Sequence, residues 1–281
     1  MHPIAFHLGS LPIRWYGVMM ALAFLAGLWT ATRRARIANV SGEIIADVTL
    51  WLLIGSIVGA RFVYVTTYWQ QEFASQPLPE IFMLQHGGLV YYGGLIGATV
   101  AGFVYLMWKK LPVWKIADIL APSIALGSVF GRIGCLLNGC CYGRASDQPW
   151  AIHFPITHET HGAALHPTEV YDALLNLFLY LALAWLFRRR WKTRIENGRL
   201  KMEKGSNATL PSSKSRDGQI LALYFIGYAV CRSTAELFRG DYPADHIHAG
   251  LTSAQVVSIG IFATGVILWI WRSRQVGTKQ G

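Results

Sequence analysis

Two arginines inside apolar segments carry the strongest chemical signal in this sequence. Arg132 interrupts the apolar run 116–137, and Arg232 interrupts a second run, 219–238. A charged residue at the centre of a bilayer costs at least ~2.5–3.5 kcal/mol on insertion scales, so a function is expected of it. A guanidinium group is planar and binds phosphate or carboxylate through two parallel hydrogen bonds. If these runs cross a membrane, the arginines predict an oxyanion site inside it.

The stretch YAVCRSTAELFR places four polar side chains at helical spacing. Separations of four, four and three residues bring them to one helix face, and the four are Tyr228, Arg232, Glu236 and Arg239. Glu236 can pair with either arginine and hold the guanidinium planes in place. The alternative is a self-neutralising charged ridge that packs against a neighbouring helix.

The stretch GRIGCLLNGCCYGR, residues 131–144, adds an asparagine and three cysteines close to Arg132. Cys135, Cys140 and Cys141 can form a disulfide, stay free, or bind a metal together with histidines of the following loop. The spacing of these residues matches no standard zinc pattern, so we expect no metal.

The elements that carry these residues are expected to be membrane helices. Of the 281 residues, 53% are hydrophobic and 14% are charged, whereas soluble domains have about a quarter charged residues. A helix needs about 20 residues to cross ~30 Å of hydrocarbon. Seven segments are predicted as spans, at 15–32, 44–69, 87–108, 116–137, 170–187, 219–238 and 251–271. We therefore expect one all-α polytopic membrane domain over residues 1–281.

Basic residues orient this domain. Nineteen of the 25 lysines and arginines lie in alternate loops or near the C-terminus, which the positive-inside rule assigns to the cytoplasm. The N-terminus is then outside and the C-terminus cytoplasmic, with an outer loop at about 138–168 and a flexible basic cytoplasmic linker at about 188–217. The net charge of +10 therefore indicates cytoplasmic loops rather than nucleic-acid binding.

Six basic residues are not explained by the positive-inside rule. All six are arginines inside helices or on the outer side, namely Arg14, Arg61, Arg132, Arg144, Arg232 and Arg239. Arginine without lysine favours planar, bidentate recognition of an oxyanion. The alternative is internal salt bridging, for instance to Asp118 or Glu236.

Two further stretches open apolar segments on the outer side. HGGLVYYGGLIG, residues 86–97, has two Gly-Gly pairs, which permit close approach of the backbone to a ligand or to a neighbouring helix. RWYG begins at Arg14, and the alternative for Trp15 and Tyr16 is an ordinary interfacial aromatic belt.

The stretch 131–144 resembles the signature of the prolipoprotein diacylglyceryl transferases, Gly-Arg-x-Gly-Asn-Phe-x-Asn-x-Glu-x-x-Gly. It matches at Gly131, Arg132, Gly134, Asn138 and Gly143. It departs where Cys135, Leu136 and Cys140 stand for Asn, Phe and Glu. The stretch HPTEVYDA, residues 166–173, resembles the family motif His-Pro-Thr-Gln-Leu-Tyr-Glu. Four further stretches resemble other motifs of the family, namely RWYG, GARFVYV, RSTAELFRGD and LTSAQVVS.

This resemblance implies an enzyme of the bacterial cytoplasmic (inner) membrane, with phosphatidylglycerol and the signal peptide of a prolipoprotein as substrates. The lipobox cysteine thiolate displaces a phosphate ester at the glycerol carbon, forms a thioether and releases glycerol 1-phosphate. No cofactor and no metal is implied. The implied catalytic residues are Arg132, Arg232 and Tyr92. The implied substrate-binding residues are Tyr16, Arg61, Arg132, Asn138, Gly143, Tyr228, Glu236 and Arg239.

One departure concerns the proton of the thiol. The family usually has a histidine before the second Gly-Gly pair, where this sequence has Tyr92, and His86 stands six residues upstream. Tyrosine has a pKa near 10 and is a poor base at neutral pH. We therefore expect deprotonation to rely mainly on the arginine field, with Tyr92 binding a phosphate or ester oxygen and His86 dispensable.

Two other functions fit the same residues. A paralogue on the same scaffold would attach a lipid group to another acceptor. A non-enzymatic membrane protein would bind or transport an anionic lipid, although the sequence shows no internal repeat of the kind many transporters have.

Overall fold

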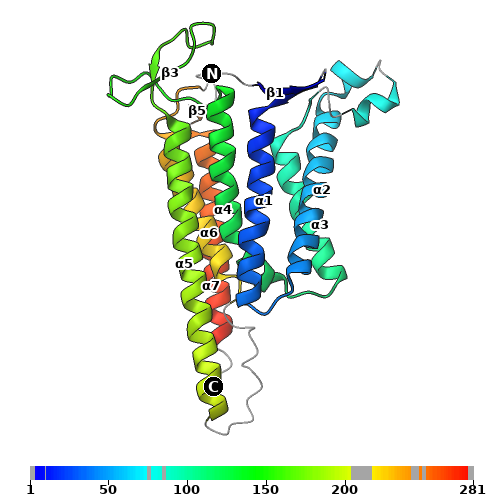
Figure 1. Cartoon of the computed structure of the whole chain (residues 1–281), viewed down its shortest axis with the longest axis vertical. Coiled ribbons are helices and arrows are strands. Elements are labelled where there is room, and N and C mark those ends of the chain that lie inside the picture. Colours follow the sequence, from blue (N-terminus) through cyan, green and yellow to red (C-terminus); the bar gives the residue numbers. More distant parts are fainter. Residues whose placement is uncertain are drawn as a thin grey trace. The chain divides into compact units, whose positions relative to one another are not determined.

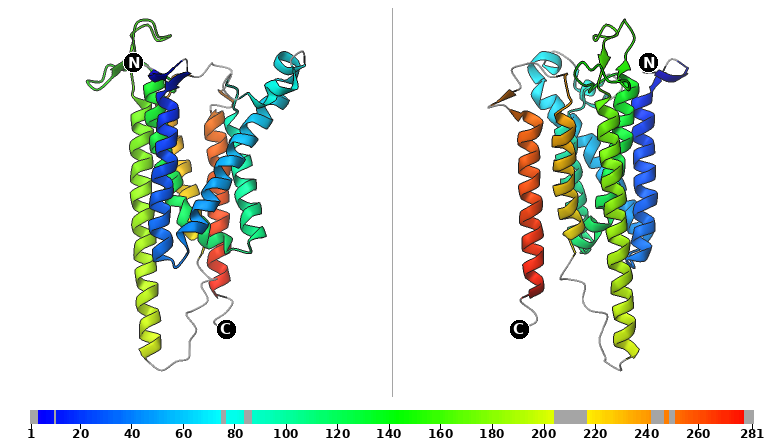
Figure 2. Two further views of the ribbon diagram at one scale, coloured as in Figure 1. Left: turned by 45° about the vertical axis from the view of Figure 1, so that its right-hand side comes forward. Right: turned by 90° about the vertical axis from the view of Figure 1, so that its left-hand side faces the viewer.

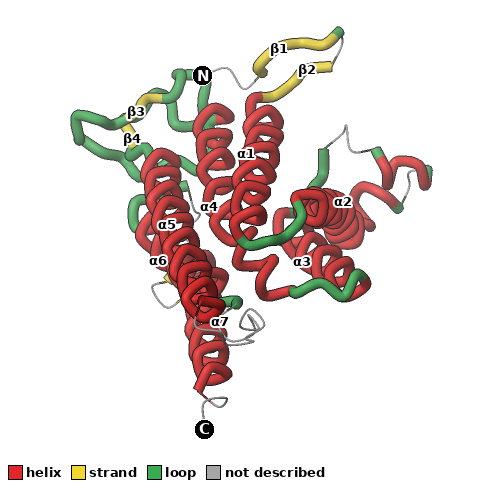
Figure 3. The backbone as a smooth tube through the Cα atoms, turned by 60° about the horizontal axis from the view of Figure 1, so that its bottom comes forward, coloured by secondary structure: helices red, strands yellow, loops and turns green. Residues whose placement is uncertain are grey.

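Helices make up most of the computed structural model, which describes residues 4–9, 11–74, 77–83, 87–203, 217–241, 247–248 and 251–277. Strands are confined to three short antiparallel hairpins, and Figure 3 shows how little of the chain they occupy. The all-α prediction is therefore confirmed. Six of the helices are long and apolar enough to cross a membrane.

Seven α-helices follow one another in the described part of the chain (Figure 1). They are α1 (Trp15–Ile37), α2 (Gly42–Thr67), α3 (Tyr91–Trp108), α4 (Val113–Asn138), α5 (Thr168–Glu203), α6 (Gln219–Glu236) and α7 (Ser253–Gly277). A π-helical turn (Trp69–Phe73) and a 3₁₀ turn (Leu78–Phe82) lie between α2 and α3. The strands are β1 (Ile4–Leu8), β2 (Leu11–Arg14), β3 (Ile152–His153), β4 (Ala164–Leu165), β5 (Ile247–His248) and β6 (Leu251–Thr252).

Length and composition identify six candidate spans instead of the predicted seven, because α6 is not among them. This helix has only 18 residues, and they include Gln219, Arg232 and Glu236, which lower its mean hydropathy. It still packs between α5 and α7, so α6 belongs to the helix bundle even though its composition alone does not identify it as a span.

The helices run further into the predicted loops than the sequence indicated. Helix α1 continues through Arg33, Arg34 and Arg36, which were assigned to a loop. Helix α5 continues to Glu203 and extends past the ends of α4 and α6 (Figure 2). Residues 188–203 of the predicted flexible linker are therefore helical, and residues 204–216 lie outside the described residues. Arginine and lysine are good helix formers, and a basic segment after a span can simply prolong it.

The chain divides into two compact units, and the single membrane domain over residues 1–281 stays a prediction. The first unit comprises Met1–Ala38 and Ala117–Gly281, and the second comprises Asn39–Ile116. Within the first unit, α5 packs on α6 and α6 on α7. Arg34 is buried and joins α1 to α4, because its Nε donates a 2.9 Å hydrogen bond to the Ile119 carbonyl and its Nη2 bonds Ser123 Oγ.

The segment between α4 and α5 is tied to the end of α6. The amide of Arg144 donates to the Phe238 carbonyl at 2.9 Å, and the amide of Gly143 donates to the His166 carbonyl at 3.1 Å. The Thr168 hydroxyl, at the first residue of α5, donates to the Cys141 carbonyl at 2.7 Å. Strands β3 and β4 form the hairpin of this predicted outer loop. These bonds fix where α4 ends and α5 begins.

Glycines bring α2 and α3 together in the second unit. A methyl group added to Gly59 would overlap the Gly93 carbonyl oxygen, and one added to Gly97 would overlap the Gly55 carbonyl oxygen. Small residues allow such close approach, which replaces the hydrophobic driving force that is missing in lipid. At the far end of the pair, the Tyr105 hydroxyl donates to Asp47 at 2.8 Å.

We predict that Gly97→Ala lowers the free energy of unfolding by about 1–3 kcal/mol, because the new methyl group overpacks the helix contact. Gly260→Ala is the control, since a methyl group on Gly260 of α7 would meet nothing within 4 Å. There alanine is expected to stabilise the helix by roughly 0.5–1 kcal/mol. Unfolding in mixed detergent micelles, followed by circular dichroism, measures both. Equal effects of the two substitutions would contradict the close packing.

Candidate functional site

Asp172 of α5 joins Arg132 and Arg232, the two arginines that interrupt apolar runs. Its Oδ2 lies 2.8 Å from Arg132 Nε of α4 and 3.9 Å from Arg232 Nη1 of α6. Its Oδ1 accepts a 2.7 Å hydrogen bond from Asn176 Nδ2, one turn along α5. Asp172 is 3% exposed. Arginines far apart in sequence are thus brought to one buried carboxylate.

Glu236 continues this row of charges on the other side of Arg232. Arg232 Nη2 lies 2.8 Å from Glu236 Oε2, four residues along α6, as the spacing predicted. The Thr252 hydroxyl, just before α7, donates to Glu236 Oε1 at 2.8 Å. Two arginines and two carboxylates therefore alternate across α4, α5 and α6. The alternation offsets the desolvation penalty that each charge would carry alone.

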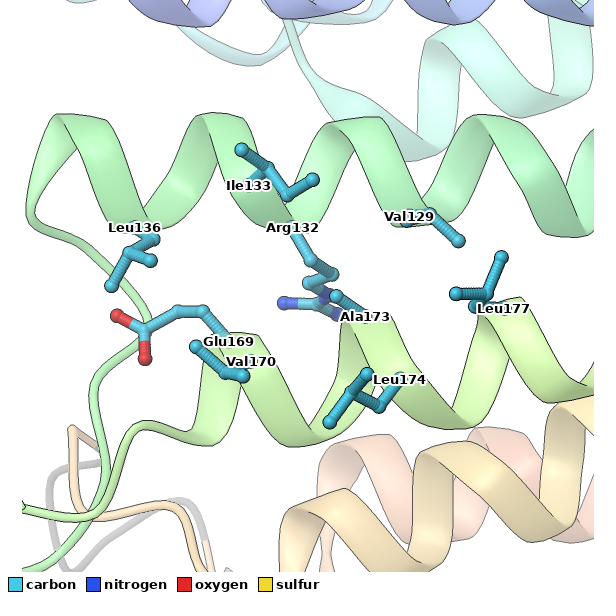
Figure 4. Close-up of a pocket in the computed structure, with 9 residues that line it drawn as sticks. All are labelled: Val129, Arg132, Ile133, Leu136, Glu169, Val170, Ala173, Leu174 and Leu177. Carbon is cyan, nitrogen blue, oxygen red and sulfur yellow. The ribbon is translucent and has the colours of Figure 1, made fainter. Parts of the chain in front are cut away.

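A pocket of about 220 Å³ opens between α4 and α5 beside this row. Figure 4 shows Arg132 projecting into its centre from α4. The pocket is lined by Val129, Arg132, Ile133, Leu136, Glu169, Val170, Ala173, Leu174 and Leu177. All of these side chains are apolar except those of Arg132 and Glu169. Leu174 is 59% exposed, so this wall of the pocket lies at the surface of the protein.

Arg132 is held through its Nε atom, which leaves the fork formed by Nη1 and Nη2 available to a ligand. Its Nε is bound by Asp172, while its Nη1 and Nη2 form no hydrogen bond with the described residues, and the side chain is 21% exposed. Two parallel N–H donors in this position match the geometry of a phosphate. The arrangement can bind an oxyanion in a mostly apolar pocket.

Glu169 is the second charged residue of the pocket. It lies in the first turn of α5 and is 1% exposed. Neither carboxylate oxygen forms a hydrogen bond within the described residues. Sequence reasoning gave no role to Glu169 or Asp172. The signal was present, because Glu169, Asp172 and Asn176 recur at separations of three and four residues and share one helix face.

Other predicted site residues of the first unit lie around the ends of these helices. Arg239 follows α6 and pairs with Asp241, with Nε and Nη2 contacts of 2.9 and 2.6 Å. Tyr228 is half-buried on α6. Asn138 ends α4 and is exposed, with Nδ2 3.8 Å from Cys140 Sγ.

Two more predicted residues take part in close contacts. Gly143 is buried, and a methyl group there would lie 2.5 Å from the His166 carbonyl oxygen. Tyr16 of α1 packs against Gly134 of α4, where an added methyl group would lie 3.1 Å from the tyrosine ring. Glycine is thus required by space at Gly143, and Gly134 lets α1 approach α4.

The second unit holds the remaining predicted residues. All five N–H groups of Arg61 donate to backbone carbonyls between the π-helical turn and α3, at distances of 2.7–3.3 Å; the acceptors are Glu80, Ile81, Met83, Gly87 and Gly88. In this structure Arg61 therefore anchors that loop. Tyr92 lies in the first turn of α3 and is 57% exposed. His86 lies outside the described residues.

The three neighbouring cysteines form a cluster. Cys135, Cys140 and Cys141 are free thiols, and their sulfur atoms all lie within 4.8 Å of one another, close enough to share a soft metal ion. Hydrogen bonds from the Cys135 and Cys140 thiols, and then the charges of Arg239 and Arg132, lower the pKa of the Cys141 thiol. His158 instead bonds the Gly139 carbonyl at 2.8 Å, and His166 bonds the Tyr171 hydroxyl at 3.2 Å.

Comparison with known proteins gives one consistent result. The family model described as "LGT: Prolipoprotein diacylglyceryl transferase" matches residues 3–271. A phosphatidylglycerol–prolipoprotein diacylglyceryl transferase of Synechococcus elongatus is 35% identical over 96% of this chain and 86% of its own length. Proteins with the same name from Finegoldia magna and Rhodospirillum rubrum are 33% and 32% identical, over 98% and 95% of this chain and 98% and 91% of their own lengths.

We predict that Asp172→Leu lowers the free energy of unfolding by about 3–5 kcal/mol, because it removes the carboxylate partner of Arg132 and one of the two carboxylate partners of Arg232. Adding Arg132→Met should recover part of this loss, which a double-mutant cycle in mixed micelles measures.

The control for this cycle is Glu196→Leu on the same helix, whose pair with Lys192 is exposed, with side-chain exposures of 59% and 80%. It should change stability by no more than about 1 kcal/mol. A loss in Asp172→Leu as small as this one would mean that the charge row is not a structural unit.

Proposed function

Because the chain belongs to the prolipoprotein diacylglyceryl transferase family, we propose that it transfers the diacylglyceryl group of phosphatidylglycerol to the lipobox cysteine of a prolipoprotein. The thiol becomes a thioether, and glycerol 1-phosphate is released. The observation that best supports this proposal is Arg132, held by Asp172 with its fork directed into the pocket between α4 and α5.

The reaction needs a stabilised leaving group. When sulfur attacks the glycerol carbon, the C–O bond breaks and its electron pair moves to a phosphate oxygen. Fixed guanidinium donors stabilise this growing charge more strongly in an apolar pocket than in water, and they need no reorganisation during the reaction. Arg132 is proposed to bind the phosphate directly. Arg232, which shares Asp172 with Arg132, is proposed to carry the second phosphate contact.

The apolar lining of the pocket suits the rest of the lipid. Side chains such as Val129, Leu174 and Leu177 offer a surface for the glycerol backbone and the start of the acyl chains. The exposed Leu174 wall lets a lipid approach Arg132 from within the bilayer. The lipid tails therefore need not leave the hydrocarbon.

Supporting roles are proposed for the other residues. Glu236 holds Arg232 in its orientation, and Arg239, Tyr228, Tyr16, Asn138 and Gly143 shape the substrate site by resemblance to the family. In the second unit, Tyr92 is proposed to bind a phosphate or ester oxygen. The role of Arg61 in substrate binding stays a prediction, because its donors hold the loop before α3.

We further propose seven membrane spans, with α6 as the additional one, an external N-terminus and a cytoplasmic C-terminus. The protein is a multi-pass membrane protein, and the bacterial inner membrane is the proposed location. No cofactor or metal is proposed for the reaction, because the pocket supplies its positive charge from arginine.

The test of this function is complementation of a bacterial strain depleted of its own transferase. The expected result is restored growth together with a diacylglyceryl thioether on the cysteine of a reporter lipoprotein, identified by mass spectrometry. Purified protein should also release glycerol 1-phosphate from phosphatidylglycerol in the presence of a lipobox peptide. Full expression without a thioether product in either assay would reject the transferase assignment.

We predict that Arg132→Lys lowers kcat by a factor on the order of 10², because an ammonium group cannot reproduce the two-pronged contact with phosphate. Arg188→Lys is the control, since Arg188 is exposed in the second half of α5, away from the pocket residues. The purified enzymes are compared by glycerol 1-phosphate release. Wild-type turnover in Arg132→Lys would remove Arg132 from the phosphate site.

A further inference from the structure

Glu169 is a buried carboxyl group without a partner, and the transferase mechanism above does not use it. It is 1% exposed, and neither of its oxygens forms a hydrogen bond within the described residues. Buried polar groups in proteins are hydrogen-bonded in the great majority of cases, so each exception needs an explanation. A ligand that donates a hydrogen bond is the explanation that the position of Glu169 offers, because it lines the same pocket as Arg132.

The neighbouring carboxylates are already engaged. Asp172 is bound by Arg132, Arg232 and Asn176. Glu236 is bound by Arg232 and Thr252. Among the carboxylates of the charge row and its pocket, Glu169 is therefore the one with neither an ion pair nor a hydrogen bond to the described residues.

The direction of its side chain agrees with this role. Figure 4 shows Glu169 extending from α5 towards Leu136 near the end of α4, on the pocket wall beyond Arg132. A phosphate on the fork of Arg132 and a donor group on Glu169 can therefore occupy one pocket together.

We propose that Glu169 is the general base that takes the proton from the substrate thiol. This inference rests on the proposed transferase function and assigns the step that the sequence left to the arginine field. Glu169 removes the S–H proton while the sulfur electron pair forms the C–S bond at the glycerol carbon. The C–O bond breaks, and its electron pair goes to the phosphate oxygen held by Arg132. The proton then leaves Glu169 to water with the released glycerol 1-phosphate.

Three other charged or titratable groups face Glu169, and they define the competing assignments. They are Arg132 of α4, Cys141 after α4 and Asp241 after α6. Asp241 is paired with Arg239. Cys141 is the competing base, because the neighbouring thiols and the charges of Arg239 and Arg132 lower its pKa and so favour a thiolate, which can accept a proton. A second competing role for Glu169 itself is acceptance of hydrogen bonds from the two hydroxyl groups of the phosphatidylglycerol head.

The decisive variant is Glu169→Gln, which keeps the size and shape of the side chain and places there the residue type found in the family motif. The full-length enzyme is assayed in detergent with phosphatidylglycerol and a lipobox peptide, between about pH 6 and pH 9, a range that spans the thiol pKa of about 8.5. Glu196→Gln, at an exposed position of the same helix, is the matched control.

The proposal predicts a loss in chemistry rather than in binding. Glu169→Gln should lower kcat at neutral pH by about 10²–10⁴-fold, the usual contribution of a general base, with KM for phosphatidylglycerol nearly unchanged. Its rate should rise about tenfold per pH unit up to the thiol pKa, because only free thiolate then reacts. Cys141→Ser should keep the wild-type pH profile. A melting curve in detergent confirms that Glu169→Gln is folded.

Several outcomes would overturn the proposal. One is a kcat in Glu169→Gln equal to that of the wild type at neutral pH. Another is a rise in KM for phosphatidylglycerol that disappears with phosphatidylpropanol, which lacks the head hydroxyls and would assign Glu169 to headgroup binding. A third is a loss of kcat in Cys141→Ser instead. An inactive wild-type enzyme would reject the transferase function itself, so the two failures are distinguishable.

Discussion

The carboxylate of Asp172 is the interaction on which the rest of the site depends. Two arginines buried in apolar helices repel each other and lose hydration, and neither is stable there without a counter-charge. Asp172 supplies it to both, at 2.8 and 3.9 Å, and so fixes how α4, α5 and α6 meet. The structural and chemical demands coincide, because the contact that neutralises Arg132 on one edge also points its remaining donors into the pocket.

The sequence predicted the parts of the site that are local. The pairing of Arg232 with Glu236 follows from helical spacing and is present at 2.8 Å. Most helix positions followed from the length of apolar runs. The partnership of Arg132 with Asp172 joins residues 40 positions apart, and no periodicity encodes it. It arises from the packing of α4 on α5, which the bonds around Arg144 and Thr168 hold in register.

Other features escaped prediction because one residue type serves two purposes. Arg61, like Arg132, is an arginine in an apolar helix. Its N–H groups, however, donate to loop carbonyls. The arginines after residue 187 suggested a cytoplasmic loop, although they also extend α5 to Glu203. Glu169 lies in the stretch HPTEVYDA, at the position where the family motif has glutamine, so the resemblance indicated only a substitution of one polar residue by another. Its lack of partners becomes visible only once the surrounding helices are placed.

The start of α5 also determines how deep in the membrane the reaction takes place. Asp172 lies four residues after Thr168, where the helix begins, which is a rise of about 6 Å, and Glu169 lies nearer still to that end. The candidate span of α5 begins at Thr168 and the hydrocarbon is ~30 Å thick, so the proposed site lies closer to one end of that span than to its middle, on the side of one leaflet. A phospholipid of that leaflet reaches the site by lateral diffusion alone. The diacylglyceryl group of the thioether product stays in the same leaflet, and the supply of lipid to that leaflet sets an upper limit on turnover.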